Sequence, residues 1–310
     1  MNRLVTDQDT DIVFFSSWIQ KFKCYRTIEK VLGTFGIKHE FLYLTKDYWA
    51  RDYMPIQIND NYLVQYCYNP DYLREKKEYI TYPTQCCSRL RQTPTLTDVI
   101  IDGGNVIKCH DSVIMTDKVF KENSKNYSRI DLLNKLEELF KAELIVIPWD
   151  KAESFGHADG MVRYIRENQL LLTNYQDFDN LLRKKILKSL GSKFEIIELH
   201  YDVSKPSENN WAYINYLRTK DIILLPWLGI EEDNQAIKQF ETLFPEYKGR
   251  IVPIDARSLI KLGGALNCIS WNVKSNQGFR DYCSAVQRFK SVSSCIKLTD
   301  NINKEGKQWN

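Results

Sequence analysis

The chain has 310 residues, of which 43% are hydrophobic and 27% are charged, so it has the composition of a globular protein with a sizeable core. Its 43 basic and 40 acidic residues give a formal net charge of +3 without a clustered basic excess, which argues against a nucleic-acid partner. No apolar run approaches the roughly 20 residues needed to cross a bilayer, so we expect no membrane partner either.

The elements predicted in the first half of the chain alternate between strands and helices. Residues 18–35 have the apolar spacing of a helix, and residues 129–141 carry one apolar helical face. Residues 69–97 are polar, contain three prolines and are typical of a long loop. Strands are predicted at 11–16, 39–44, 56–58, 62–66, 99–101, 112–116 and 144–148.

The second half continues the same alternation. A helix is predicted over 177–190, with Asp177 as its N-terminal cap and Gly191 as its stop, and a second helix over 231–244. Strands are predicted at 161–165, 170–173, 194–199, 222–225 and 251–254. We expect a single catalytic domain over 1–298 and a polar C-terminal tail over 299–310.

The cysteines and the N-terminus favour a cytoplasmic location. Eight cysteines in a chain of this length do not resemble the dense disulfide framework of a small secreted protein. The first seven residues lack the apolar segment of a signal peptide. The four histidines show no zinc-ligand spacing, and we expect no metal and no organic cofactor.

A repeat of strand, helix, strand and polar loop runs through the chain. The loops are marked by residue types that carry chemistry, and successive markers are separated by 51 to 58 residues. Five units of about 54 residues predict an α/β fold with radial repetition, in which equivalent loops converge on one site. The markers are Asp52, Gly103, His157, Asn215 and Cys268.

The loop around His157 is the most informative of the five. His157 precedes Asp159 by two residues with glycine on both sides, so an extended backbone would direct both side chains to the same side. Cys268 would add a thiol, Asp52 a second carboxylate, and Asn105 and Asn215 two amides, with Asp102 as an additional candidate. This set could serve acyl transfer, but two carboxylates beside a thiol would raise its pKa unless a cation joins them.

A planar guanidinium is the cation that fits this set. Its forked N–H donors match carboxylates, and its charge would help the Cys268 thiol to ionise. We therefore expect attack of the Cys268 thiolate on the guanidinium carbon, with His157 as general acid and then general base. Asp52 and Asp159 would hold the guanidinium nitrogens, and the product would be a ureido group with release of ammonia.

Five motifs of the chain resemble those of the agmatine deiminase and bacterial peptidyl-arginine deiminase family, over roughly residues 10 to 285. This likeness implies the five-bladed α/β-propeller (pentein) fold of the guanidine-modifying superfamily. It implies that Cys268 is the nucleophile, His157 the general acid/base, and Asp52 and Asp159 the guanidinium-binding carboxylates. It places Trp49, Asn105, Asn215 and Gly264 at the substrate. The motifs are Trp49-x-Arg51-Asp52, Asp102-Gly103-Gly104-Asn105, Gly156-His157-x-Asp159-Gly160, Tyr213-Ile214-Asn215 and Gly263-Gly264-x-x-x-Cys268.

The chain departs from the family pattern at three places. Asn267 stands where the family usually has histidine, Met54 stands where a glycine is common, and Ser270-Trp271-Asn272 replaces a glutamine-containing segment. These departures concern the identity of the substrate more than the chemistry.

The resemblance implies hydrolysis of agmatine to N-carbamoylputrescine and ammonia, a step of polyamine and putrescine biosynthesis. Three alternatives stay open: deimination of arginine in a peptide or protein, transfer of the amidino group to an amine, and a catalytically silent guanidine-binding module. Asn267 keeps the last of these open. The expected partner is a small cationic guanidine, and homo-oligomerisation is left undecided.

Overall fold

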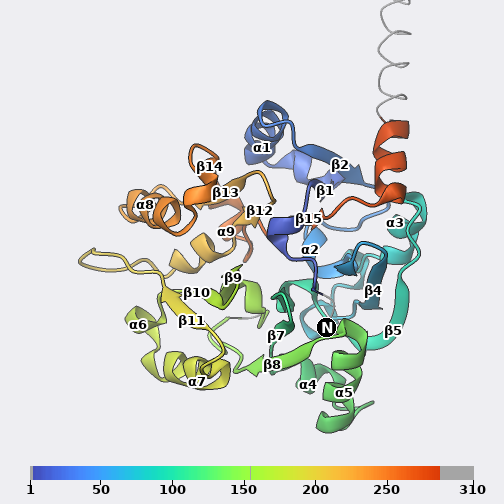
Figure 1. Cartoon of the computed structure of the whole chain (residues 1–310), viewed down its shortest axis with the longest axis horizontal. Helices are drawn as coiled ribbons and strands as arrows, with labels where there is room; N and C mark the ends of the chain where they lie inside the picture. The colour runs from blue at the N-terminus through green and yellow to red at the C-terminus, as the bar shows by residue number, and fades with distance from the viewer. Residues whose placement is uncertain (1–2, 154, 287–310) are drawn as a thin grey trace, which may run out of the picture.

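Five small sheets surround a common centre in a computed structural model of the chain, which describes residues 3–153 and 155–286 (Figure 1). Each sheet has three strands, and its middle strand pairs antiparallel with one neighbour and parallel with the other. The predicted fivefold repetition is therefore confirmed.

The sheets follow one another in chain order around the centre. Named from the antiparallel strand to the parallel one, they are β15 (Ser270–Val273), β1 (Ile12–Ser16) and β2 (Lys38–Leu42); β3 (Ile56–Asn59), β4 (Tyr62–Cys67) and β5 (Thr95–Ile100); β6 (Ile107–Lys108), β7 (Ser112–Thr116) and β8 (Glu143–Ile147); β9 (Val162–Arg166), β10 (Gln169–Leu172) and β11 (Glu195–Glu198); β12 (Leu217–Arg218), β13 (Ile223–Trp227) and β14 (Ile251–Asp255).

The first sheet joins the two ends of the described chain. The last strand, β15, pairs antiparallel with the first strand, β1, with Ile12 opposite Val273 and Phe15 opposite Ser270. Every residue of both strands is buried, because β1 lies in the middle of its sheet and β15 faces the centre of the ring. Ring closure therefore depends on hydrogen bonds and apolar packing between the first and last strands of the described residues.

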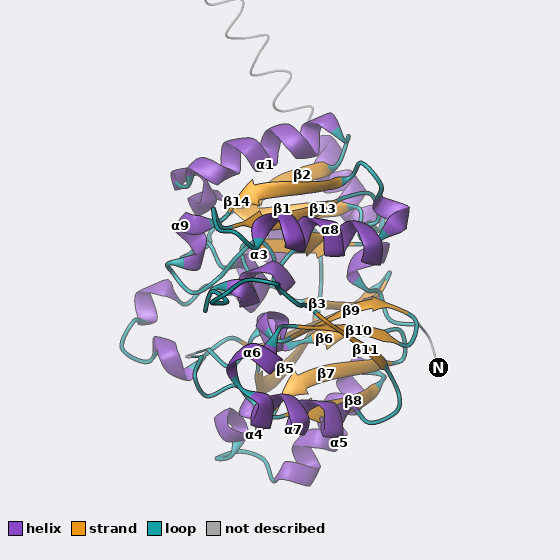
Figure 2. Ribbon diagram, turned by 90° about the vertical axis from the view of Figure 1, so that its left-hand side faces the viewer, coloured by secondary structure: helices purple, strands orange, loops and turns teal. Residues whose placement is uncertain are grey.

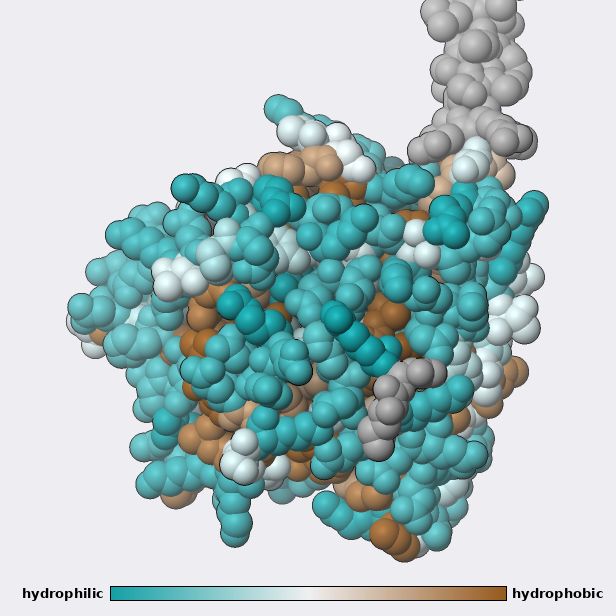
Figure 3. All heavy atoms as spheres, viewed as in Figure 1, coloured by the Kyte–Doolittle hydropathy of each residue, from teal (hydrophilic) through white to brown (hydrophobic). Residues whose placement is uncertain are grey.

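Helices that connect each middle strand to its parallel partner cover the sheets, whereas α2 and α9 follow the third strands β2 and β14 (Figure 2). Ile28 and Leu32 of α1, for example, share an apolar cluster with Val13 and Phe15 of β1. The face seen in Figure 3 is largely hydrophilic, with apolar residues in its recesses. The helices are α1 (Lys23–Thr34), α2 (Ala50–Tyr53), α3 (Pro83–Arg89), α4 (Lys118–Asn123), α5 (Arg129–Phe140), α6 (Tyr175–Phe178), α7 (Asn180–Leu190), α8 (Asp233–Leu243) and α9 (Arg257–Ile260).

The prediction of one long loop over 69–97 is wrong. The segment contains α3, which begins at Pro83, and the start of β5 at Thr95. Proline suits the first turn of a helix because its fixed φ is helical and its missing N–H would have no partner there. The buried thiols of Cys86 and Cys87 anchor α3 to the core, so the second unit has the crossover helix that the repeat requires.

Two helix boundaries also differ from prediction. Residues 18–35 form the 3-10 helix η2 (Ser17–Lys21) followed by α1, because Phe22 has an extended backbone with φ −92° and ψ 133°. Asp177 is not the cap of α7, since it lies inside α6. The carboxylate of Asp179 instead accepts the N–H groups of Leu181 and Leu182.

Among the described residues, no helix is long and apolar enough to cross a membrane. The predicted tail over 299–310 and the predicted boundary at residue 298 lie outside the described residues. The single-domain assignment stays a prediction.

Candidate active site

Five loops, one from each sheet, meet where the third strands of the sheets end. Three of them form the 3-10 helices η5 (Gly103–Asn105), η6 (Ala158–Gly160) and η7 (Asn210–Ile214), and a fourth forms α2. The fifth follows α9 and carries Cys268. Neighbouring turns are in contact, α2 with η5, η5 with η6, and η6 with η7. Side chains distant in sequence therefore share one buried region.

The imidazole of His157 lies between two carboxylates. Its Nδ1 is 3.6 Å from Oδ1 of Asp52 in α2, and its Nε2 is 2.9 Å from Oδ2 of Asp102, the residue before η5. All three side chains are buried. Carboxylates at both ring nitrogens fix the orientation of the imidazole and favour its charged form.

Gly104 makes this arrangement sterically feasible. Its N–H donates to Asp52 Oδ1 at 3.1 Å. A Cβ at this position would lie 2.7 Å from both Asp52 Oδ1 and His157 Nδ1, closer than real Cβ contacts allow. The backbone of η5 can approach the carboxylate and the imidazole only because residue 104 has no side chain.

The thiol of Cys268 contacts Asp159 of η6 and Asn215, which follows η7. Its Sγ is 3.3 Å from Oδ1 of Asn215 and 3.6 Å from Oδ2 of Asp159. The Asn215 amide oxygen also accepts the backbone N–H of Cys268 at 3.3 Å, and its Nδ2 donates to the Asp159 carbonyl at 3.4 Å. Asn215 therefore ties the loop of Cys268 to η6.

The backbone between His157 and Asp159 is not extended throughout, contrary to expectation. His157 is extended, with φ −87° and ψ 139°, but Ala158 begins the 3-10 turn η6. Asp159 consequently accepts hydrogen bonds from Asn267 and Cys268, whereas His157 is hydrogen-bonded to Asp102 and forms an ion pair with Asp52. The turn separates the two side chains into two halves of the site.

The aromatic ring of Trp49 forms one boundary of the region. A Cβ on Gly264 would lie 2.4 Å from Cζ3 of Trp49, so the ring lies directly against the backbone before Cys268. Asn105 has a different environment, because its amide oxygen accepts the backbone N–H of Thr116 at 2.9 Å and attaches η5 to the end of β7.

Two further residues touch the candidate set. Asp102, only an additional candidate from the sequence, is the shortest contact of the His157 ring. Its Oδ1 is buried and has no hydrogen-bond partner among the described residues. Asn267 donates its amide to Asp159 Oδ2 at 2.6 Å. In the sequence, Asp102 is marked only by its position before Gly103-Gly104, and Asn267 only by its position before Cys268. Neither position predicts which atoms are in contact.

Burial and charge give the site unusual acidities. Burial alone would lower the pKa of His157, but Asp52, Asp102 and Asp159 outweigh it and raise the pKa to about 10. Burial raises the pKa of Asp52 to about 8; Asp102 and Asp159 add to this rise, and His157 opposes it. In the unliganded site, His157 is therefore an imidazolium at neutral pH. The Asp52 carboxylate binds a proton more strongly than an exposed carboxylate would.

The Cys268 thiol is a weak acid in this environment. Burial raises its pKa well above the usual range, and the charges of Asp159 and Asp52 raise it further. The thiol is therefore protonated until positive charge enters the site. A bound cation would reverse the effect of the two carboxylates, which links thiolate formation to occupancy.

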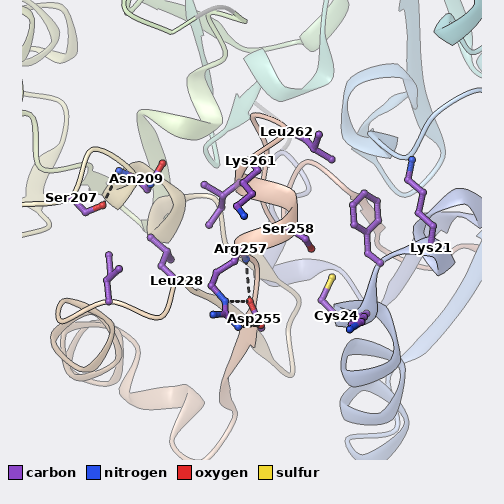
Figure 4. A pocket seen from close by; sticks show the side chains of 14 residues that line it. Lys21, Cys24, Ser207, Asn209, Leu228, Asp255, Arg257, Ser258, Lys261 and Leu262 are labelled. Carbon is purple, nitrogen blue, oxygen red and sulfur yellow. Dashed lines mark hydrogen bonds and ion pairs between the residues drawn. The ribbon is translucent and has the colours of Figure 1, made fainter.

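No group of three or more His, Cys, Asp or Glu side chains within 3–153 and 155–286 is arranged to hold a metal ion. A separate groove of about 780 Å³ lies between η2, the start of α1, and α9 (Figure 4). Its rim carries Lys21, Lys23, Arg257 and Lys261, with Arg257 paired to Asp255. None of the candidate site residues lines it.

Comparison of the sequence with known proteins identifies one family. The model for Porphyromonas-type peptidyl-arginine deiminases matches residues 18–273, a range that includes all five loops. A Marinomonas sp. (strain MWYL1) protein, provisionally named an agmatine deiminase, is 25% identical over 213 residues, which are 56% of this chain and 57% of the relative. The match thus spans a little over half the length of the curated relatives.

Solved structures extend the similarity to almost the whole fold. Agmatine deiminase from C. jejuni superposes with a TM-score of 0.72 at 19% identity, covering 89% of this chain and 97% of that one. Agmatine deiminase of Enterococcus faecalis gives 0.71 at 15% identity over 88% and 96%. DDAH from Pseudomonas aeruginosa gives 0.57 at 12% identity over 85% and 99%. The predicted five-bladed α/β-propeller (pentein) fold is confirmed.

Proposed function

Because the chain belongs to the Porphyromonas-type peptidyl-arginine deiminase family, we propose that it is a guanidine deiminase. It hydrolyses a C–N bond of a guanidinium group to give a ureido group and ammonia, with agmatine as the lead substrate. The observation that carries this proposal is the His157 imidazole between Asp52 and Asp102, in one buried cluster with the Cys268 thiol.

Substrate binding in this proposal is electrostatic. Asp52 and Asp159 accept hydrogen bonds from the guanidinium nitrogens, and ionised partners make such bonds short and strong. The substrate cation lowers the pKa of Cys268 by offsetting the same two carboxylates that raise it in the free site. The substrate thereby helps to generate its own nucleophile.

The chemistry proceeds in two halves. The Cys268 thiol loses its proton to solvent when the substrate binds, and the resulting thiolate attacks the guanidinium carbon. His157 donates its proton to the departing nitrogen, which leaves as ammonia. The covalent S-alkylthiouronium intermediate is then attacked by water, whose proton His157 accepts. The C–S bond breaks, the thiol is regenerated and the ureido product leaves.

The names of the matched proteins support two substrates. Relatives and solved structures carry the name agmatine deiminase, which favours agmatine. The family model carries the name of a peptidyl-arginine deiminase, which favours arginine within a peptide as the second candidate. Amidino transfer and a silent guanidine-binding role are the remaining alternatives from the sequence.

One assay separates these candidates. The protein is incubated with agmatine, free arginine or a blocked arginine peptide, and ammonia and the ureido product are measured. Ammonia with N-carbamoylputrescine from agmatine supports the lead proposal, and citrulline in the peptide supports the second. Ammonia-free consumption that requires an added amine indicates amidino transfer. Binding of agmatine without consumption of any substrate would contradict enzymatic activity.

The acidities of the site predict an alkaline pH optimum. Asp52 binds the guanidinium as a carboxylate, and since its pKa is raised to about 8, this form is lost as the pH falls through that value. His157 must carry a proton, and its raised pKa keeps that proton until the pH rises through about 10. We expect kcat/KM for agmatine to rise through the first value and fall through the second. An optimum below neutral pH would contradict these assignments.

Asp159→Asn is expected to lower kcat/KM for agmatine by about a hundredfold or more, because a hydrogen bond to an ionised partner is replaced by a neutral one in a buried site. Agmatine affinity, measured by calorimetry on the Cys268→Ala background, should fall with it. Asp60→Asn is the control, since Asp60 is exposed and pairs with Lys274 at the surface. Unchanged binding in Asp159→Asn would show that the carboxylate is misassigned.

Cytoplasmic location, a role in polyamine and putrescine biosynthesis, and homo-oligomerisation remain predictions from the sequence. Size-exclusion measurements on the purified chain would address the last of these.

A further inference from the structure

Lys118 is a buried lysine that the proposed chemistry does not use. It begins α4, and its side chain is only 1% exposed. Lysine is almost never fully buried unless its charge is compensated. Burial would lower the pKa of this lysine, but Asp102, Glu122 and Asp71 outweigh burial and raise it, so Lys118 is charged.

The ammonium of Lys118 joins four segments of the chain. Its Nζ lies 3.8 Å from Asp102 Oδ2, 3.3 Å from Asp71 Oδ1 and 3.5 Å from Glu122 Oε1. It also donates to the backbone carbonyl of Phe155 at 2.5 Å. Asp71 belongs to the 3-10 helix η3 (Asp71–Leu73), and Phe155 lies in the loop of His157, two residues before it. Lys118 therefore contacts both the carboxylate partner of His157 and the loop that carries His157.

The stem of Lys118 is held as tightly as its charge. A Cβ on Gly156, whose φ is +69°, would lie 2.7 Å from Lys118 Cδ and 2.6 Å from Trp149 Nε1. The ammonium also lies 4.9 Å from the centre of the Tyr72 ring, and that ring packs edge-on against His157 with a centroid distance of 6.1 Å. The lysine consequently has little freedom to move away from Asp102.

We propose that Lys118 is a positioning residue for His157, which balances the charge of Asp102 and fixes both Asp102 and the 155–157 backbone relative to the imidazole. The effect of Lys118 on catalysis rests on the proposed function. The placement and the charge coupling are properties of the folded protein and can be measured without a substrate.

The sign of the coupling follows from the charges around the pair. His157 faces Asp52 from α2, Asp102 from before η5, Asp159 from η6 and Tyr72 from η3. Removing a nearby positive charge strengthens proton binding by the imidazole, and removing a negative charge weakens it. Lys118 in turn faces Asp71, Asp102 and Glu122, with Lys121 paired to Asp71 at the surface.

The primary experiment is an NMR titration of the His157 imidazole, assigned with His157→Gln. Lys118→Met is expected to raise the pKa of His157 by about two units, the size expected for a unit charge roughly 6–7 Å away at an effective dielectric constant near 20. Asp71→Asn should shift it in the opposite direction. Lys118→Arg, which keeps the charge, should stay near the wild-type value. Opposite shifts from two partners of one ion pair are not produced by general loosening of the fold.

Lys121→Met is the matched control. Lys121 lies in the same helix and also pairs with Asp71, at 3.3 Å, but its side chain is 60% exposed and its charge is screened by solvent. Its removal should leave the His157 titration unchanged. Equal shifts in Lys118→Met and Lys121→Met, or no shift in Lys118→Met, would overturn the proposal. If Lys118→Met does not fold, the Asp71→Asn variant decides the question. A higher or an unchanged His157 pKa in Asp71→Asn would overturn the proposal.

The kinetic readout is separate. In an active enzyme, both limbs of the kcat/KM profile should move to higher pH in Lys118→Met and remain in place in Lys121→Met. An inactive wild-type protein with the expected NMR shifts would refute the proposed function while leaving the position of Lys118 supported. An active enzyme in which the His157 pKa is unchanged by Lys118→Met would support the proposed function and refute the role of Lys118.

Discussion

Replacing Cys268 with alanine is expected to abolish turnover, lowering kcat by about 10⁴-fold or more, because removal of a covalent nucleophile disables the whole catalytic unit. Agmatine binding should persist, since Asp52 and Asp159 remain in place and supply the charge complement. The measurements are ammonia release for turnover and calorimetry for affinity. No covalent adduct should appear in the mass spectrum of the variant when substrate is added.

The control for this experiment is Cys67→Ala, because Cys67 is an exposed cysteine at the end of β4, whereas Cys268 is buried. Its replacement should leave kcat/KM within about twofold of wild type. Full activity in Cys268→Ala would exclude the thiol as nucleophile. A protein in which wild type and variant bind agmatine equally and neither releases ammonia would be the silent binding module.

Gly104→Ala is expected to lower kcat/KM by about a hundredfold or more, because displacement of reacting groups by about 1 Å has effects of that size. The added methyl group would meet Asp52 Oδ1 and His157 Nδ1, each at 2.7 Å, and would displace the N–H that Asp52 accepts. Overpacking in a buried site should also lower the free energy of unfolding by about 1–3 kcal/mol. Steady-state kinetics and urea denaturation measure the two effects.

Gly33→Ala provides the comparison. Gly33 lies in α1, and a Cβ there would meet nothing within 4 Å. Alanine in a helix should be neutral or stabilising by up to about 1 kcal/mol, with unchanged activity. Wild-type kinetics in Gly104→Ala would mean that η5 can move away from the imidazole, and that the close packing there is not required for catalysis.

The repeating architecture could be predicted because each unit has at least two strands with a clear apolar pattern. The spacing of Asp52, His157 and Cys268 then carried the inference of a shared site. The inner strands β6, β12 and β15 were not predicted. The first two contain only two residues each and therefore no periodicity, and β15 has only four residues. Helix α3 was missed because proline and polar residues conceal its short buried face.

The atomic partnerships of the site could not be predicted in the same way. The contact of Asp102 with His157 joins residues 55 positions apart, and its geometry depends on how two turns pack. Lys118 stands in a stretch with Lys121 and Glu122 that would suggest a solvated helix face. Only packing against Gly156 and Trp149 reveals that its charge is internal. Burial of this kind is a tertiary property.

Closure of the ring by β15 has a consequence for biosynthesis. Cys268 is two residues before β15, and its backbone carbonyl accepts the N–H of Arg51 at 3.1 Å, so the sulfur reaches its position only when the final strand docks beside the first. While β15 is undocked, the chain presents no correctly placed thiol to a guanidine, even when the strands of the other four sheets have been synthesised. The reactivity of Cys268 is thus coupled to closure of the ring during folding, and cleavage just before residue 270 should abolish turnover.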